Sequence, residues 1–447
     1  MQIWYRIEKE LILDESPRSP WLYVALKGQD MLTAEELVVI DIRVNDAPPS
    51  PSSGGSWERR PGGIWVLRGQ FPGAIEKVVT QVDVLFGKDA VDPRPHWVLM
   101  LSSLKLNGKP EISDMHMVTG VGVCKDAIDA HGKDLPVSEA DPLTIEFIGR
   151  ILDVEEPDLM VLTGDQLHHD IPDSQTALFK AVAPIIERSI PFAVVFGNHD
   201  SEGSHALSRA AQMSILQNLP LSLCDAGPEY VDGIGNFSCE VLAREPPGNS
   251  LATLYFLDSH GGISSEIKEP DYDFIKPSQI KWFTEISQTL QKERKDSKTN
   301  NQFHLSLAFQ HIPLPEFGDH RLSIHTGHRR EPTEGPSANS RFYDTLVKER
   351  ISVLACGHDH VNDFCALLPS QMQQNGDAAP QTGPWLCYGG ASGFGGYCSY
   401  NKKRYHRRSR VFELDTKGRS LRTGMQVEYS TDKVEELVLV ENGVIPY

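Results

Sequence analysis

Five short polar clusters, rich in His and Asp, occur in one order along the chain and constrain its fold more than any other feature. Three of them end apolar runs that are typical of buried β-strands: LMVLTGD, PFAVVFGNHD and ISVLACGHDH. In an open α/β sheet the carboxyl ends of neighbouring strands meet at one edge, so residues just past them converge in space. The pattern therefore predicts one site built from all the clusters. They are D-M-H at residues 114–116, G-D-Q at 164–166, G-N-H-D at 197–200, Q-H-I-P at 310–313 and G-H-D-H at 357–360.

The residue types in these clusters indicate a site for two metal ions that act on a phosphoester. Two cations about 3.5–4 Å apart can hold the attacking and leaving oxygens of a phosphoryl transfer, and a carboxylate is needed to bridge them. Asp165 is the predicted bridge because it stands at a strand end behind Gly164, which permits a tight turn. Asp114 and His116 are two residues apart, and on an extended segment they would point the same way and bind one metal.

The other clusters complete the two sets of ligands. Asn198 is expected to give a neutral amide oxygen to the second metal. His311 and His358 would add imidazole nitrogens to that metal, while His360, two residues beyond His358, would turn to the first. The mixed nitrogen and oxygen set suits Fe, Mn or Zn, and leaves the identity of the two ions open. No Cys lies among the clusters, which argues against a thiolate zinc site.

Two residues beside the ligands are expected to serve catalysis directly. His199 would contact the substrate phosphate or protonate the leaving oxygen, and Asp200 could orient that imidazole. His168 and His169, in the loop after Asp165, are predicted to be solvated or bonded within the loop. Any one of these residues has an ordinary structural explanation, since a strand-end Asp is more often a helix N-cap and an Asn a turn residue. The hypothesis depends on the joint pattern.

These motifs and spacings resemble the calcineurin-like metallophosphoesterase superfamily, in which D-x-H, G-D, G-N-H-D, a lone His and G-H-x-H occur together. Five further segments are similar to fungal dose-dependent cell-cycle-regulator phosphatases and plant purple-acid-phosphatase-like proteins: DVLFGKDAVDPRPHW, SDMHMVTGVG, GDQLHHDIPD, FQHIPLPEF and GGASGFGGY. The resemblance covers nearly the whole chain. It implies a two-sheet sandwich flanked by helices (α/β/β/α), and hydrolysis of phosphate monoesters, including phosphoproteins or small phosphomonoesters. It also implies seven metal ligands, with His199 as the acid or phosphate-binding group: Asp114, His116, Asp165, Asn198, His311, His358 and His360.

Two departures from the family pattern lead to their own expectations. Purple acid phosphatases place a Tyr ligand three residues after the bridging Asp, where this chain has His168, so no tyrosinate charge-transfer band is expected. The run NGKPEISDMH before the first motif offers Ile112 as its apolar side chain, whereas a strand buried on both faces should be nearly continuously apolar. Either the first strand is short here, or the sequence lacks part of it.

Other functions remain compatible with the same residues. A phosphodiesterase acting on nucleotides or lipids would use the same ligands with a different rim, and damage to the first strand would leave a scaffold without turnover. A net charge of −18 disfavours binding to nucleic acids. The basic run at residues 402–410 is predicted to be a solvated strand edge, with a phosphopeptide-binding rim as the alternative. Substrate identity and oligomeric state are not determined by these patterns.

Length and patterning predict two domains in the 447 residues. Residues 1–107 alternate short apolar runs with Pro and Gly clusters, as in a β-rich domain, and residues 108–447 alternate strands and helices, as in a layered α/β catalytic domain. Helices are expected over residues 143–153, with Asp141 as N-cap, and over 174–188 and 278–292.

The same patterns favour a cytoplasmic protein that does not enter a membrane. The first ten residues carry charges, and no stretch of about 18 apolar residues occurs in the sequence. The seven cysteines are odd in number and lack C-x-x-C spacing, so a disulfide framework is not expected.

Overall fold

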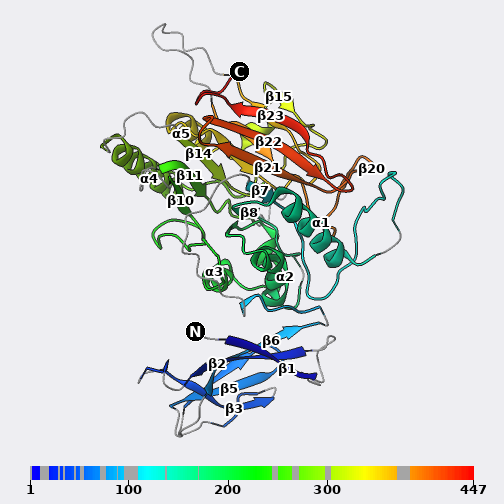
Figure 1. Cartoon of the computed structure of the whole chain (residues 1–447), viewed down its shortest axis with the longest axis vertical. Coiled ribbons are helices and arrows are strands. Elements are labelled where there is room, and N and C mark those ends of the chain that lie inside the picture. The colour runs from blue at the N-terminus through cyan, green and yellow to red at the C-terminus, as the bar shows by residue number, and fades with distance from the viewer. Residues whose placement is uncertain are drawn as a thin grey trace.

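The computed structural model contains a β-rich N-terminal part and a larger part in which helices flank sheets (Figure 1). The predicted domain boundary at residues 107 and 108 lies outside the described residues, so the domain limits stay a prediction. The run at residues 96–106, expected to include a strand, also lies outside them. The structure describes residues 3–10, 20–28, 31–33, 36–44, 47–50, 55–70, 77–87, 89–94, 109–135, 138–169, 171–243, 250–263, 271–296, 304–369 and 383–446.

Two antiparallel three-stranded sheets form the N-terminal part. One has the order β1 (Ile3–Glu10), β2 (Pro20–Gly28), β6 (Lys77–Phe86), and the other β3 (Val38–Val44), β5 (Ile64–Gly69), β4 (Ser56–Arg60). Alternate residues of β6 are buried, as the period of two in a strand requires. A shared apolar cluster includes Ile64 and Val66 of one sheet and Val82 and Val84 of the other. The prediction of a β-rich N-terminal region is confirmed.

The larger part is built on two mixed sheets, of six and seven strands. The six-stranded sheet runs β23 (Val434–Val440), β22 (Ser420–Val427), β21 (Arg408–Asp415), β7 (Lys109–Ile112), β8 (Met160–Thr163), β9 (Phe192–Val195). The seven-stranded sheet runs β10 (Phe237–Leu242), β11 (Ser250–Phe256), β14 (Leu305–Phe309), β16 (Val353–Cys356), β18 (Trp385–Tyr388), β17 (Cys365–Leu367), β15 (Ser323–Thr326). Two short hairpins lie outside these sheets, β12 (Gly262–Ile263) with β13 (Asp271–Tyr272) and β19 (Ser399–Tyr400) with β20 (Lys403–Arg404). The 3-10 turns His199–Ser201 and Pro315–Gly318 lie outside them as well.

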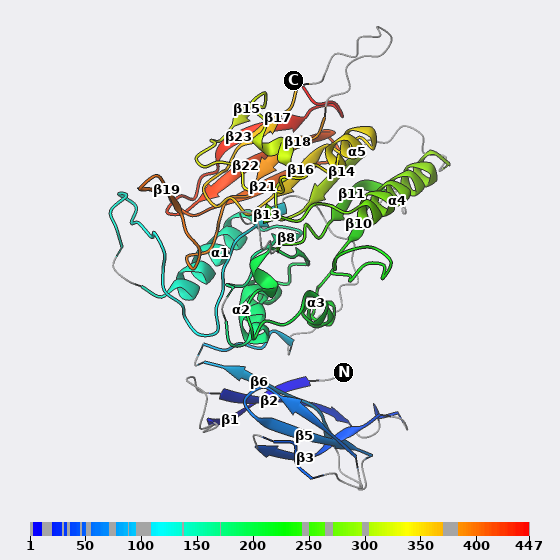
Figure 2. The same ribbon diagram turned by 180° about the vertical axis from the view of Figure 1, so that it is seen from behind.

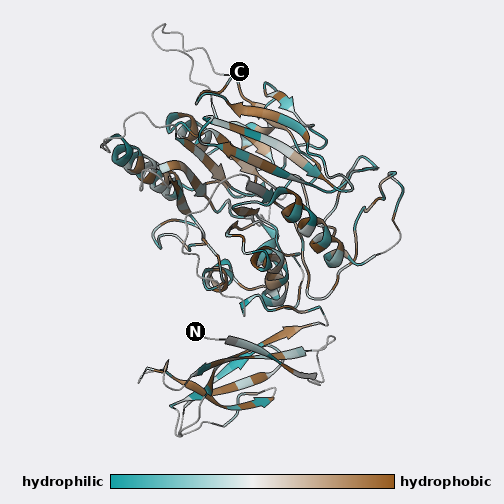
Figure 3. Cartoon of the chain, in the orientation of Figure 1, coloured by the Kyte–Doolittle hydropathy of each residue, from teal (hydrophilic) through white to brown (hydrophobic). Residues whose placement is uncertain are grey.

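The two sheets face each other and helices cover their outer faces (Figures 1 and 2). Val161 of β8 and Phe309 of β14 share the apolar layer between the sheets. Leu162, on the opposite face of β8, packs in the cluster formed with α1 (Ala140–Glu155), α2 (Ser174–Glu187) and α3 (Arg209–Gln217). Ala308 of β14 packs in the cluster with α4 (Pro277–Asp296) and α5 (Phe342–Lys348). The expected α/β/β/α sandwich is confirmed, and its central strands are among the most hydrophobic segments in Figure 3.

The first strand of the sandwich is short, which is one of the two alternatives raised by its sequence. β7 spans four residues, and its backbone pairs with β21 on one side and β8 on the other. Its one buried apolar side chain is Ile112, among the residues of β7 whose side chains are described. Glu111 beside it is fully buried and lies opposite Arg410 of β21. Strand pairing on both sides thus holds a segment that lacks a continuous apolar run.

The predicted helices at 143–153 and 278–292 lie within α1 and α4. The one at 174–188 corresponds to α2, which continues through Pro184 and ends one residue earlier, with Arg188 as its C-cap. The N-cap assigned to Asp141 was wrong, because α1 begins at Ala140 and Glu139 is its N-cap. Asp141 instead accepts hydrogen bonds from Val118 N and from the buried Lys180. Its carboxylate is therefore committed to tertiary partners. No helix in the described ranges is long and apolar enough to span a bilayer.

The basic run at residues 402–410 is solvated only in its first half, where Lys402 and Lys403 are exposed in the β19–β20 hairpin. Its second half is not a solvated strand edge, which corrects that part of the prediction. β21 is an interior strand, and Arg407, Arg408 and Arg410 are buried. Arg408 forms an ion pair with Asp363, and Arg410 donates to Tyr388 O at 2.7 Å. Burial was decided by neighbours such as β7, which lie some 300 residues away in sequence. Cys365 and Cys387, on adjacent β17 and β18, form a disulfide, which the sequence patterns did not predict.

Candidate metal centre

The five polar clusters meet where strands of the two sheets end. Parallel pairing aligns β7, β8 and β9 in one sheet and β14 and β16 in the other, so the residues after them lie at one edge. The backbone continues these links past the strands, because Asp114 N donates to Gly164 O and His116 N to Asp165 O, both at 3.0 Å. The position of the polar clusters directly after apolar, strand-like runs in the sequence had predicted this convergence.

Six of the predicted ligands form two compact groups of three. In each group one ligand atom from every residue lies within 4.8 Å of the others. All six side chains are buried. The division agrees with the expectation that His360 serves the first metal while His311 and His358 serve the second. The first group is Asp114, His116 and His360, and the second is Asp165, His311 and His358.

Asp165 lies between the two groups. Its Oδ2 is 3.2 Å from His311 Nε2 and 3.9 Å from His116 Nε2, so one carboxylate oxygen faces a ligand of each group. Its Oδ1 accepts a hydrogen bond from His199 N at 2.8 Å, which fixes the orientation of the carboxylate. A bridging carboxylate requires this placement.

Four buried side-chain atoms of the site have no hydrogen-bond partner among the described residues. Buried polar atoms in native proteins nearly always have one, and an unmet partner costs about 1–3 kcal/mol. Carboxylate, amide and imidazole atoms of this kind coordinate Fe, Mn and Zn. The donor set therefore fits two such cations. The four atoms are Asp114 Oδ1, His116 Nδ1, Asn198 Oδ1 and His358 Nε2.

The backbone at these ligands is not extended, which corrects the premise used for Asp114 and His116. Both residues have left-handed conformations, with φ of 53° and 48°, and Asp165 and His358 have φ of 51° and 76°. Such conformations cost about 1–3 kcal/mol each and persist where surrounding structure enforces them. Asp114 and His116 nevertheless contribute to one ligand group, because backbone bonds to the segment after β8 hold both turns.

Charges at the site favour the protonation states that metal ligands need. Burial would raise the pKa of Asp114, but His360 and His311 lower it to about 2, so this carboxylate is ionised. Burial and the neighbouring His311 lower the pKa of His358 to about 3, which leaves it neutral. For His311, burial lowers the pKa but the Asp165 carboxylate raises it to about 9, so an entering cation would displace a proton.

His199 is held by a residue that sequence analysis missed. Its Nδ1 lies 2.6 Å from Glu202 Oε2, within the 3-10 turn at His199–Ser201 and the residue after it. Burial lowers the pKa of His199, but the Glu202 hydrogen bond and the Asp165 charge raise it above its usual value. The sequence signal for this contact was the position of Glu202, a carboxylate three residues after His199.

Asp200 does not orient the His199 imidazole, so that prediction was wrong. Its carboxylate accepts hydrogen bonds from three backbone N–H groups, of Asp165 at 3.0 Å, Leu167 at 2.8 Å and Gly197 at 2.7 Å. It thereby joins the turns that carry two of the polar clusters. Asp200 acts on the position of Asp165 rather than on the imidazole.

Two further contacts orient imidazole ligands. His360 Nδ1 lies 2.7 Å from Tyr397 O, and the Tyr397 ring stacks on His360 with centroids 4.0 Å apart. His311 Nδ1 lies 2.8 Å from Thr163 O. Since a carbonyl only accepts, both imidazoles carry a proton on Nδ1 and present Nε2 to the site. Tyr397 ends the Gly-rich run GGASGFGGY, in which a Tyr after two glycines was the available signal.

His168 lies beside the ligand groups and belongs to neither. Its ring centroid is 5.7 Å from that of His116, and its Nε2 is 3.1 Å from Lys125 Nζ. His169 is exposed, with its ring 4.2 Å from that of His168. The prediction that His168 is bonded within loops agrees with these contacts.

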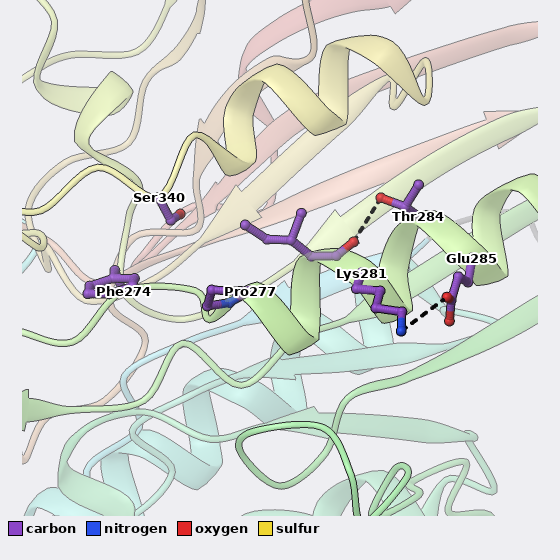
Figure 4. A pocket seen from close by; sticks show the side chains of 7 residues that line it. Phe274, Pro277, Lys281, Thr284, Glu285 and Ser340 are labelled. Atoms are coloured by element: carbon purple, nitrogen blue, oxygen red, sulfur yellow. Dashed lines mark hydrogen bonds and ion pairs between the residues drawn. The ribbon is translucent and has the colours of Figure 1, made fainter.

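A pocket of about 490 Å³ beside the N-terminal half of α4 is separate from this centre (Figure 4). Its walls are mostly apolar carbon, and they contain none of the predicted ligands. The lining residues are Phe274, Pro277, Ile280, Lys281, Thr284, Glu285 and Ser340.

Comparison with known proteins agrees with the resemblance seen in the motifs. The family model of the Calcineurin-like phosphoesterase matches residues 111–362. The chain is 31% identical over 415 residues to Phosphatase DCR2 of Saccharomyces cerevisiae, covering 82% of this chain and 68% of the yeast protein. It is 36% identical over 321 residues to Probable inactive purple acid phosphatase 29 of Arabidopsis thaliana, covering 68% and 76%. A solved dimetal phosphatase from Danio rerio aligns with a TM-score of 0.45 and 12% identity, over 75% of this chain and 99% of that one. The chain belongs to the calcineurin-like phosphoesterase family.

Proposed function

We propose that this protein is a phosphoric monoester hydrolase that depends on two metal ions and acts on phosphoproteins. The observation that carries the proposal is the pair of three-residue ligand groups on either side of Asp165, with buried ligand atoms that lack hydrogen-bond partners among the described residues. Family membership supports phosphoester hydrolysis, and the yeast relative is named a phosphatase. The seven predicted ligands, Asn198 included, would hold two ions drawn from Fe, Mn and Zn.

Two bound cations would neutralise phosphate oxygens and provide an activated water at neutral pH. The chain's own groups position the site and move the proton. Asp200 and His199 N fix Asp165 between the two ligand groups. Glu202 holds His199 through Nδ1, which leaves Nε2 available to donate a proton to the leaving oxygen.

A catalytically impaired scaffold is the second candidate, and two observations favour it. β7 has four residues, and the name of the Arabidopsis relative describes that protein as probably inactive. Against it, every ligand position of the motifs is filled by a suitable residue in this chain. A phosphodiesterase would share the same ligands, so substrate comparison must separate it.

The test is elemental analysis of the purified protein, together with hydrolysis of p-nitrophenyl phosphate and bis(p-nitrophenyl) phosphate. We expect two metal ions per chain, and monoester turnover that a chelator abolishes and added Mn or Fe restores. No tyrosinate charge-transfer band should appear. Faster cleavage of the diester would favour a phosphodiesterase, and one ion or none without rescue would favour the scaffold.

A matched pair of variants assigns the activity to the centre. Asp165→Asn should reduce turnover at least about 100-fold and lower the metal content, because the bridge is lost. Asp153→Asn makes the same chemical change at an exposed ion pair with Arg188. This variant should retain both the turnover and the metal content of the wild type. Normal turnover in a folded Asp165→Asn protein would remove Asp165 from the bridge.

A further inference from the structure

Lys125 is a cation beside the first ligand group with no carboxylate paired to it among the described residues. It is exposed, and its hydrogen-bond partner is His168 Nε2 at 3.1 Å. The His168 ring in turn lies 5.7 Å, centroid to centroid, from that of His116. The ammonium therefore stands one side chain away from a predicted metal ligand.

The acidic residues that follow Lys125 in the same loop are occupied elsewhere. Asp126 accepts from Ser399 Oγ and Cys398 N and is ion-paired with Arg404. Asp129 accepts from two backbone N–H groups of its own loop. Asp170 lies outside the described residues. Asp126 and Asp129 therefore do not neutralise the Lys125 ammonium.

The backbone of Lys125 is held by hydrogen bonds at both its N–H and its carbonyl group. Lys125 N donates to Phe394 O at 2.9 Å, and the buried Arg407 donates to Lys125 O. Figures 1 and 2 both show the loop that carries Lys125, which precedes α1, beside the β19–β20 hairpin. His406 Nε2, just after that hairpin, lies 3.0 Å from Asp129 O. The position of the lysine is thus set by tertiary contacts.

The hydrogen bond to His168 leaves part of the donor capacity of the ammonium unused. An ammonium group only donates hydrogen bonds, so His168 must accept through Nε2. One of the three N–H bonds of Lys125 is used in this way, and the other two are available. An oxygen anion beside the reacting phosphate would complete this shell with a charge-assisted hydrogen bond.

We propose that Lys125, positioned by His168, binds a second anionic group of the substrate next to the phosphate that is hydrolysed. This inference rests on the proposed phosphomonoesterase function and narrows its substrate class to phosphopeptides with an acidic or phosphorylated neighbour. Lys125 is a specificity residue and His168 its positioning residue.

The test measures binding of labelled peptides that carry a non-hydrolysable phosphonate in place of phosphoserine, with Mn present. Three peptides differ at the residues that flank the phosphonate, which are Gln, Glu or a second phosphonate. We expect the wild type to bind one or both anionic peptides about tenfold more tightly than the Gln peptide, as one charge-assisted hydrogen bond allows. The measured ratio is the affinity for an anionic peptide divided by the affinity for the Gln peptide. The anionic peptide with the larger ratio identifies carboxylate or phosphate as the source of the anion.

Charge variants assign the preference to this lysine. Lys125→Gln should bring the ratio near one, Lys125→Glu should reverse it, and Lys125→Arg should retain most of it. His168→Phe removes the acceptor and should lower the ratio while the metal content stays at two ions per chain. Lys133→Gln is the matched control, because Lys133 is exposed in the same loop and its backbone N–H bonds Asp129, so the ratio should not change.

Failure of this inference is distinct from failure of the proposed function. Equal affinities for the three peptides in the wild type, or a ratio unchanged by Lys125→Glu, would overturn the subsite even if monoesters are hydrolysed. Charge-selective binding without hydrolysis of any monoester would support the subsite and overturn the hydrolase.

Discussion

At the metal centre, single glycines control how closely the ligand side chains approach one another. Gly164 precedes Asp165 with φ of +101°, and a Cβ built there would overlap the His311 ring. A Cβ at Gly197 would overlap the Asp165 carboxylate and backbone. These positions therefore need glycine for space, and Gly164 needs it for its backbone conformation as well.

Gly164→Ala should disrupt the second ligand group, because the new methyl would displace His311. We expect metal content below two ions per chain and monoester turnover reduced at least about 100-fold, measured by elemental analysis and p-nitrophenyl phosphate hydrolysis. Gly132→Ala is the control, since Gly132 also has positive φ, of +76°, but has nothing within 4 Å of a built Cβ. It should cost about 1 kcal/mol of stability and leave metal content unchanged. Equal behaviour of the two variants would contradict the steric argument.

Glu202→Gln should weaken catalysis without removing metal. The carboxylate beside His199 Nδ1 stabilises the protonated imidazole, and an amide cannot supply that charge. The expected result is a kcat about tenfold lower, with KM and metal content close to wild type, from steady-state kinetics and elemental analysis. Glu229→Gln, at an exposed loop position, is the matched control and should not alter kcat. A kcat unchanged in Glu202→Gln would remove this contact from the mechanism.

At the scale of elements, β21 stabilises the short β7 and the loop that follows β16. It pairs with β7 along its length, while Arg408 reaches across to Asp363, which also forms an ion pair with Arg330. Burial raises the pKa of Glu111 in β7 to about 8, and the Arg410 charge opposes this shift. β7 is therefore held by strand pairing with β21 and β8 rather than by a continuous apolar face.

Asp363→Asn should lower stability in a pH-dependent way. Burial raises the pKa of Asp363, but Arg408 and Arg330 lower it below its usual value. A lowered folded-state pKa adds stability above the unfolded pKa of about 3.9, and this is lost as pH falls through the folded value. Urea unfolding should show wild type more stable by about 3 kcal/mol at pH 7, with the gap shrinking below about pH 4. A gap constant down to about pH 3 would contradict an ionised Asp363.

At the scale of the whole molecule, α2 joins the N-terminal part to the sandwich. Phe86 N at the end of β6 donates to Thr176 Oγ1 at 3.1 Å, and the Arg94 guanidinium lies 4.7 Å from the Phe179 ring centre. Lys180 is buried and forms ion pairs with Asp89, which follows β6, and with Asp141 of α1. The N-terminal part is therefore docked through side chains as well as connected by the chain.

Lys180→Met should destabilise the protein strongly, because it leaves Asp141 buried without its cation. The expected loss is about 3–5 kcal/mol in the free energy of unfolding, measured in urea. Lys281→Met is the control on α4, where Lys281 is exposed and lies 3.8 Å from Glu285 (Figure 4). It should change stability by less than about 0.5 kcal/mol. Similar losses in both variants would show that burial of the Lys180 pairs is not what matters.

The sequence by itself determined the fold class and the choice of candidate ligands. Apolar runs such as MVLT at β8 and VLAC at β16 must be buried on both faces, and the polar residues after them must meet at a shared edge. The layered α/β class and the choice of ligands depend on local periodicity and on residue chemistry, whereas the two-sheet sandwich was implied by the resemblance of the motifs to a known family.

Tertiary structure alone decided the partners of the polar side chains. Asp200 accepts hydrogen bonds from backbone N–H groups and Glu202 holds His199, although Asp200 ends the G-N-H-D motif and Glu202 comes only two residues after it. Arg410 is buried because β7, some 300 residues earlier, lies against it, and Lys125 meets His168 from 43 residues away. Burial and hydrogen bonding are set by neighbours in space, and periodicity along the chain carries no record of them.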